Sequence, residues 1–255
     1  MKILGFKPDS MQDWDYGLAS VIFTGNCNLH CPSCHAGGLI KSTGTYDPEQ
    51  ILDLLDRKKR LVNKVVICGG EPTLEPDLED FIRRLKEMGL LVNLNTNGTS
   101  PEVLRRLQEQ GLVDYLAMDI KGPRELYGML TGLGERVRIE DIEASVKLAP
   151  GFPDYEFRTT LSPYFRQGGS GEELTWMNAQ DALNMISWIR GFGIKAGDKA
   201  GKHYLQRFVA RPKGIMIDDR FSLENLPEEY REFPQSLQKE IQTAGKEVGY
   251  DFQLR

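Results

Sequence analysis

Short apolar runs alternate with amphipathic stretches along most of the chain. The apolar, β-branched runs predict six strands, over residues 19–24, 64–68, 90–95, 114–120, 155–161 and 204–209. Between them, apolar residues recur every three or four positions, which predicts five helices, over residues 47–61, 76–88, 100–111, 138–149 and 178–190. Two glycine-rich stretches, residues 166–173 and 191–202, are predicted to be loops.

Strands that alternate with helices predict an α/β protein in which helices cover a parallel sheet. Six βα units are too few for the usual closed barrel of eight strands. We therefore expect a partial, open TIM-like (βα)6 barrel, with a doubly wound sheet as the alternative. Residues 1–212 are expected to form this core. The charged tail, residues 213–255, is expected to be a helical C-terminal extension that packs on the core and ends in a short strand.

The composition is ordinary for a globular protein, and the net negative charge argues against nucleic acid as a partner. The 32 basic residues are outnumbered by 37 acidic ones, so no basic excess exists to neutralise a nucleic-acid backbone. No apolar run approaches the ~20 residues that span a bilayer. Residues 3–6 are too few for the apolar core of a signal peptide. We therefore expect a cytoplasmic protein that binds neither nucleic acid nor membrane.

Three of the four cysteines follow the first predicted strand, with the spacing Cys27-x3-Cys31-x2-Cys34. Clustered cysteines in a reducing compartment indicate metal or redox chemistry rather than disulfides. Thiolates bind both zinc and iron–sulfur clusters. Three thiolates on a four-iron cluster leave one iron open to a substrate or cofactor. The alternative is a zinc site with His35 as fourth ligand, although adjacent residues such as Cys34 and His35 rarely point at one metal.

Glycine-rich and polar motifs follow the next three predicted strands, at the sheet edge where α/β proteins place their sites. Gly69-Gly70 permits a backbone path closed to residues with a Cβ, and lets a ligand approach the main chain. The segment Asn95-Thr96-Asn97-Gly98 is either a plain turn or part of a site. Asp119 and Lys121 alternate with Ile120 and so face one side of the strand end, as a salt bridge or a ligand-binding pair.

Other polar residues have weaker assignments. Arg158 and Thr160 share one face of their strand, where they would suit a nucleoside inside an open barrel or simply face solvent. His203 precedes a predicted strand and is expected at the surface. Cys68 ends an apolar strand and is expected to be a buried, unreactive small hydrophobe.

The spacing Cys27-x3-Cys31-x2-Cys34 resembles the signature of the radical S-adenosylmethionine (SAM) superfamily. Gly69-Gly70-Glu71-Pro72 resembles its SAM-binding motif. His35 and Asp119-Ile120-Lys121 resemble the glycyl-radical-enzyme activases. Further stretches resemble the branch that activates anaerobic ribonucleoside-triphosphate reductase: residues 1–6, 69–78, 114–121, 155–160 and 205–208. The likeness as a whole covers about residues 1–212.

The resemblance implies a [4Fe–4S] cluster on Cys27, Cys31 and Cys34 that cleaves SAM reductively to a 5′-deoxyadenosyl radical. That radical would install a glycyl radical on a partner, anaerobic ribonucleotide reductase, with a one-electron donor such as flavodoxin or ferredoxin. Two alternatives stay open: a radical SAM enzyme that modifies a small molecule or another peptide, and a non-catalytic zinc or iron–sulfur binding protein. The lack of a second cysteine group favours a glycine on a large partner.

The resemblance also implies roles for single residues. Glu71 would accept from the SAM amine, Lys121 would meet the SAM carboxylate, and Asp119 would order Lys121 or a bound cation; Asp119 and Lys121 are the catalytic candidates. The cofactor-binding candidates are Gly69, Gly70, Glu71, Asn95, Thr96, Asp119, Lys121, Arg158 and His35.

Two sequence details complete the picture of the site. A Cβ added at Gly70 is expected to obstruct SAM and leave the cluster intact, because the two lie on different loops. Ser33 and Ala36 depart from the branch pattern, which commonly has an aromatic residue and an asparagine there.

Overall fold

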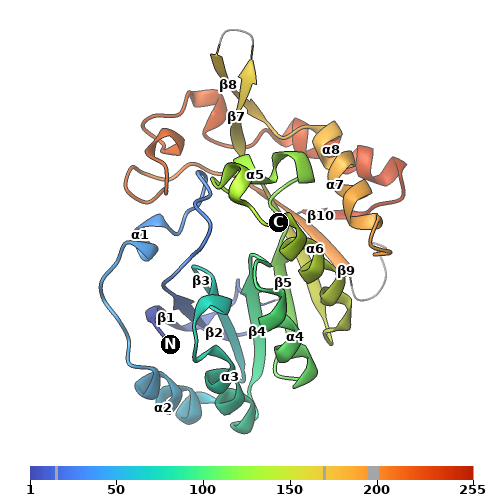
Figure 1. Ribbon diagram of the computed structural model, residues 1–255. Coiled ribbons are helices and arrows are strands. Elements are labelled where there is room, and N and C mark those ends of the chain that lie inside the picture. The colour runs from blue at the N-terminus through green and yellow to red at the C-terminus, as the bar shows by residue number, and fades with distance from the viewer. Residues whose placement is uncertain (15–16, 169–170, 195–200, 255) are drawn as a thin grey trace. The chain divides into compact units, whose positions relative to one another are not determined.

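The computed structural model describes residues 1–14, 17–168, 171–194 and 201–254 (Figure 1). The chain forms two compact units. Unit 1 comprises residues 1–28, 39–118 and 141–155, and unit 2 comprises residues 29–38, 119–140 and 156–255. No helix in the described part of the chain is both long and apolar enough to cross a membrane.

Unit 1 is built on a mostly parallel sheet. Strands β2 (Ala19–Thr24), β3 (Lys64–Gly69), β4 (Leu91–Thr96) and β5 (Tyr115–Asp119) pair in parallel, with Val21 opposite Val66 and Ile67 opposite Leu94. Strand β1 (Ile3–Ser10) pairs antiparallel with β2. Continuous apolar runs such as that of β3 suit parallel strands that are buried on both faces.

The helices of unit 1 bury the apolar faces that their sequences predict. Helix α2 (Pro48–Lys58) begins at Asp47, whose side chain accepts from the N–H of Glu49. Helices α3 (Leu78–Glu87) and α4 (Pro101–Glu109) bury their leucine faces. The shorter elements are helix α1 (Gly37–Ile40), which has residues in both units, and the 3-10 turn η1 (Pro72–Leu74). Helix α6 (Ile139–Leu148) lies mostly in unit 1.

Unit 2 contains strands β6 (Tyr155–Leu161), β9 (Gly201–Arg207) and β10 (Phe252–Leu254), and β9 pairs in parallel with β10. Helix α7 (Ala179–Arg190) begins with a capping box in which Asn178 and Asp181 exchange hydrogen bonds. The other helical elements of unit 2 are the helices α5 (Tyr127–Leu130) and α8 (Gln235–Glu247) and the 3-10 turns η2 (Arg124–Leu126), η3 (Gly134–Arg136), η5 (Asp219–Phe221) and η6 (Glu228–Tyr230). The 3-10 turn η4 (Ala149–Gly151) belongs to unit 1.

A β-hairpin projects from unit 2 where the glycine content predicted a loop. Strands β7 (Pro163–Gly168) and β8 (Gly171–Trp176) pair antiparallel (Figure 1), so the loop prediction for residues 166–173 is wrong apart from residues 169–170, which lie outside the described residues. Tertiary packing explains the difference, because an aromatic cluster from the C-terminal region covers the base of the hairpin. Phe165 meets Phe221 edge to face at 5.5 Å, and Trp176 stacks on Tyr230 at 5.4 Å.

The main sheet has the strand order β1-β2-β3-β4-β5-β6-β9-β10, and β5 and β6 have residues in both units. The predicted class, an α/β protein with a mostly parallel sheet, is confirmed. Two strands differ from the prediction. Strand β1 was not among the predicted strands, and β9 spans residues 201–207 rather than 204–209. Residues 195–200 of the second glycine-rich stretch lie outside the described residues.

Candidate functional site

The cysteine loop follows β2 and has residues in both units: Cys27 in unit 1, and Cys31 and Cys34 in unit 2. All three are partly exposed. The N–H of Cys34 donates to the carbonyl of Cys31 at 3.0 Å, and the N–H of Ala36 donates to Sγ of Cys34 at 3.4 Å. Three cysteine side chains on one short loop thus supply sulfur donors. Because thiolates are the usual ligands of iron–sulfur clusters, this donor chemistry fits the implied cluster.

Among the described residues, no three His, Cys, Asp or Glu side chains form a group that could hold a metal ion. The assignment of Cys27, Cys31 and Cys34 as cluster ligands is therefore a proposal based on their chemistry and spacing.

Backbone hydrogen bonds from distant segments of unit 2 hold the loop in place. The N–H groups of Ile217 and Asp218 donate to the carbonyls of Cys34 and Pro32, each at 3.3 Å. On another side, the N–H of His30 donates to the carbonyl of Thr131 at 2.9 Å. The C-terminal region thus supports the loop that carries two of the three cysteines, a contribution that the sequence did not indicate.

Asp119 and Lys121 form an ion pair at the end of β5, with Lys121 Nζ 2.7 Å from Asp119 Oδ2. Burial alone would lower the pKa of Lys121, but negative charge on Asp119, Cys31 and Cys34 outweighs it and raises that pKa above its ordinary value. Burial also raises the pKa of Tyr127, whose neighbours include Lys121. Lys121 is therefore a permanent cation beside two cysteines of the loop.

The glycine pair at the end of β3, Gly69-Gly70, touches the start of the cysteine loop. A Cβ on Gly70 would lie 2.1 Å from the carbonyl oxygen of Asn26, the residue before Cys27. The same carbonyl accepts from the N–H of Glu71, and Gly69 has a φ of 111°. The two loops are in backbone contact, so the reason given for expecting an intact cluster in a Gly70 variant, that the sites lie on different loops, does not hold.

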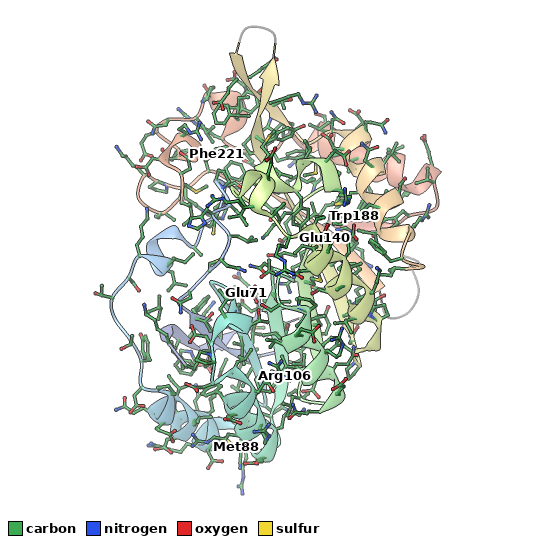
Figure 2. All side chains as sticks on the ribbon, in the orientation of Figure 1. Glu71, Met88, Arg106, Glu140, Trp188 and Phe221 are labelled. Atoms are coloured by element: carbon green, nitrogen blue, oxygen red, sulfur yellow. The ribbon has the colours of Figure 1, made fainter. Side chains whose placement is uncertain are left out.

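Glu71 is fully buried and joins the β3 loop to the end of β4 (Figure 2). Its Oε1 accepts from Thr73 N at 3.1 Å, Thr73 Oγ1 at 2.6 Å and Thr96 Oγ1 at 2.7 Å, and its Oε2 accepts from Asn97 N at 2.6 Å. Burial raises the pKa of Glu71, although these hydrogen bonds oppose the shift. The carboxylate thus has a bracing role between two candidate binding loops, beyond the SAM contact that the resemblance implies.

The segment after β4 forms a polar network next to Cys27. Asn97 Nδ2 donates to Asn28 Oδ1 at 3.0 Å and lies 4.0 Å from Sγ of Cys27. Thr99 Oγ1 donates to Asn97 Oδ1 at 2.7 Å and lies within hydrogen-bond distance of Asn28. Within the described part of the chain, Asn95 Oδ1 is buried without a hydrogen-bond partner, so it offers an acceptor to a ligand. Sequence reasoning singled out Asn95 and Thr96 but missed Asn28 and Thr99.

The remaining candidates lie in unit 2. Arg158 pairs with Glu156, a fully buried carboxylate on the same face of β6, and Thr160 Oγ1 lies 3.4 Å from Gln206 Oε1. Sequence reasoning missed both partners. The ring of His35 lies 5.8 Å from that of Phe208. Burial lowers the pKa of His35, and the positive charge of Arg211 lowers it further.

A pocket of about 690 Å³ opens in unit 2 beside the cysteine loop. Pro32 and Ser33 form part of its wall, together with Tyr164 and Phe165 of the hairpin and Arg124 of η2. The pocket has the size of a ligand site and combines apolar with charged groups. Ser33 therefore contributes to a recess next to the residues proposed to bind the cluster.

Known proteins resemble this chain in sequence and in fold. A Methanocaldococcus jannaschii protein named as a glycyl-radical enzyme activating enzyme is 37% identical over 121 residues, covering 47% of this chain and 50% of that protein. A Pyrococcus abyssi protein named as a GTP 3',8-cyclase is 35% identical over 133 residues, covering 50% of this chain and 43% of that protein. The chain thus spans no more than about half the length of these relatives.

Among solved structures, Streptococcus suis SuiB bound to its precursor peptide SuiA has a TM-score of 0.63 at 14% identity, covering 92% of this chain and 48% of that one. A likeness at such low identity shows the fold. The model of the Radical SAM superfamily matches residues 21–159, more than half of the chain and the whole stretch from β2 into β6. The chain therefore belongs to the Radical SAM superfamily, whose enzymes use a [4Fe–4S] cluster and S-adenosylmethionine.

Proposed function

We propose that the protein is a radical SAM activase that installs a glycyl radical on a partner enzyme, anaerobic ribonucleotide reductase. The observation that carries the proposal is the Asp119–Lys121 ion pair, whose lysine is within electrostatic range of Cys31 and Cys34. A lysine that stays protonated beside the proposed cluster ligands suits the carboxylate of SAM. The name of the Methanocaldococcus jannaschii relative supports the activase branch.

The three loop cysteines and the ion pair would bind the cluster and the SAM carboxylate. Cys27, Cys31 and Cys34 would hold the cluster, which supplies the electron that cleaves bound SAM to methionine and a 5′-deoxyadenosyl radical. Lys121 would bind the SAM carboxylate, and Asp119 would fix the direction of the ammonium through its 2.7 Å contact.

Other residues would complete the cofactor site. Gly69 and Gly70 would let SAM approach the main chain, and the buried Oδ1 of Asn95 would accept a hydrogen bond from it. Glu71, Thr96, Arg158 and His35 stay candidates for cofactor contacts.

The pocket beside Ser33 is the proposed entry for the substrate. A volume of about 690 Å³ accommodates a short peptide segment such as a glycine-bearing loop. We further propose that residues 1–212 act as the radical SAM core and residues 213–255 as its extension. The electron donor would be a flavodoxin or a ferredoxin.

A small-molecule reaction is the second candidate, because a relative named as a GTP 3',8-cyclase is about as similar as the activase relative.

To test the proposed function, the reconstituted protein is mixed without oxygen with SAM, a reductant and its candidate reductase. We expect 5′-deoxyadenosine by chromatography and, in step with it, a glycyl doublet in the electron paramagnetic resonance spectrum of the reductase. Deoxyadenosine with no glycyl signal would overturn the activase proposal, and zinc in place of iron and sulfide would overturn radical chemistry as well.

A further inference from the structure

His203 is a buried histidine with both ring nitrogens hydrogen-bonded, and the expectation that it lies at the surface is wrong. It sits on β9 with 1% of its surface exposed, within 6 Å of the rings of Phe157, Tyr250 and Phe252. Its Nε2 lies 2.9 Å from Thr159 Oγ1, and its Nδ1 lies 2.8 Å from the hydroxyl of Tyr250. The apolar rings around it fix the imidazole between these two hydroxyl groups.

The direction of each hydrogen bond follows from the last acceptor in the chain of contacts. Thr159 Oγ1 lies 2.6 Å from the carbonyl oxygen of Ile120, which can only accept, so the threonine proton is used there. His203 Nε2 must then carry a proton and donate it to Thr159. With Nε2 protonated in the neutral ring, Nδ1 accepts from the Tyr250 hydroxyl. Burial lowers the pKa of His203 to about 3, which keeps the ring neutral.

This chain of hydrogen bonds ends at Ile120, the residue between Asp119 and Lys121 of the proposed SAM carboxylate site. The carbonyl of Ile120 belongs to the peptide group that leads into Lys121, and Thr159 holds it. The N–H of Ile120 belongs to the peptide group that follows Asp119, and it donates to the carbonyl of Arg158 at 2.8 Å. Both peptide groups between Asp119 and Lys121 are therefore fixed by β6.

We propose that Tyr250, His203 and Thr159 form a positioning network that orients Lys121 for SAM and makes the segment before β10 part of the cofactor site. The proposal rests on the proposed function in one respect, the role of Lys121 in binding the SAM carboxylate. The three residues are positioning residues, because they act through the Ile120 peptide.

The test compares Thr159→Val, which keeps the shape but removes the hydroxyl, with Thr159→Ser, which keeps the hydroxyl. SAM affinity is measured by calorimetry on reconstituted proteins with equal iron content, alongside their unfolding midpoints. We expect Thr159→Val to weaken SAM binding by about fivefold, as for one lost hydrogen bond, and Thr159→Ser to restore the affinity. Ser20→Ala is the matched control, since it removes a similar buried hydroxyl that donates to the carbonyl of Pro8.

Two results would overturn the proposal while the wild type still binds SAM: equal affinity in wild type and Thr159→Val, or the same loss of affinity in Ser20→Ala. A wild type that binds no SAM at equal iron content would instead refute the proposed function, together with the network's role in it. Nitrogen-15 spectra of histidine-labelled, oxidised holoprotein give a second readout that a merely stabilising role would not predict. We expect a protonated Nε2 and an unprotonated Nδ1 for His203, distinguished from His30 and His35 by its loss in His203→Gln. A protonated Nδ1 would refute the network's direction.

Discussion

The contact between Gly70 and Asn26 predicts that a single methyl group will damage the cysteine loop. In Gly70→Ala the new Cβ would lie 2.1 Å from the Asn26 carbonyl oxygen, whereas ordinary contact distances are about 3.5 Å. The carbonyl must therefore retreat by more than about 1 Å, and it also accepts from the N–H of Glu71. Overpacking and the weakened hydrogen bond together cost about 2 to 4 kcal/mol of unfolding free energy.

The displaced residue directly precedes Cys27, so we expect the variant to bind less iron as well as less SAM. The assay is iron and sulfide per chain after anaerobic reconstitution, with urea unfolding to measure the loss of stability. Gly44→Ala is the matched control, because a Cβ at Gly44 meets nothing within 4 Å. Normal iron content and stability in Gly70→Ala would refute the reasoning. Normal iron with weaker SAM binding would restore the view that the two loops are independent.

Three further predictions follow from the site and its surroundings. Cys31→Ala should lose most of its iron and all SAM cleavage, whereas Cys68→Ala should lose only about 1 kcal/mol of unfolding free energy; normal iron in Cys31→Ala would exclude the proposed ligand set. Lys121→Met should weaken SAM binding by about 10- to 100-fold in calorimetry at unchanged iron content, while Lys246→Met, on the exposed last turn of α8, should not change it. In the folded protein the pKa of His203 is lowered to about 3, so the folded chain does not take up the proton that the unfolded chain binds as pH falls through about 6.5. Between pH 7.5 and 5.5, urea unfolding should therefore show that the wild type loses about 1.4 kcal/mol more than His203→Gln; equal losses would contradict the burial of a neutral ring.

The sequence predicts the parts of the fold that depend on local pattern. The predicted ranges located strands β2 to β6 to within a residue or two. Strand β3 has the continuous apolar run expected of a parallel strand buried on both faces. It could not predict the β7–β8 hairpin, where glycines suggested a loop. Contacts with Phe221 and Tyr230, more than 50 residues further along the chain, stabilise strands that local propensity disfavours.

The candidate site was predictable where chemistry follows from residue type and spacing. The alternation of Asp119 and Lys121 predicted a pair on one side of a strand end, which the structure shows as an ion pair. The metal loop on Cys27, Cys31 and Cys34, inferred from their spacing, stays a prediction. Roles that depend on three-dimensional contact were not predictable. The burial of His203 depends on rings of β6 and of the C-terminal segment, and no periodicity reports such a contact.

The central claim is that the protein takes a hydrogen atom from a glycine of a partner protein. The most direct measurement is isotope transfer: the candidate reductase is produced with α-deuterated glycine and incubated without oxygen with the reduced, reconstituted protein and SAM. Mass spectrometry of the 5′-deoxyadenosine then reports the source of its new hydrogen. We expect deoxyadenosine one mass unit heavier with the deuterated reductase, and none of this shift with unlabelled reductase. Unlabelled deoxyadenosine formed at the same rate with both reductases would contradict it.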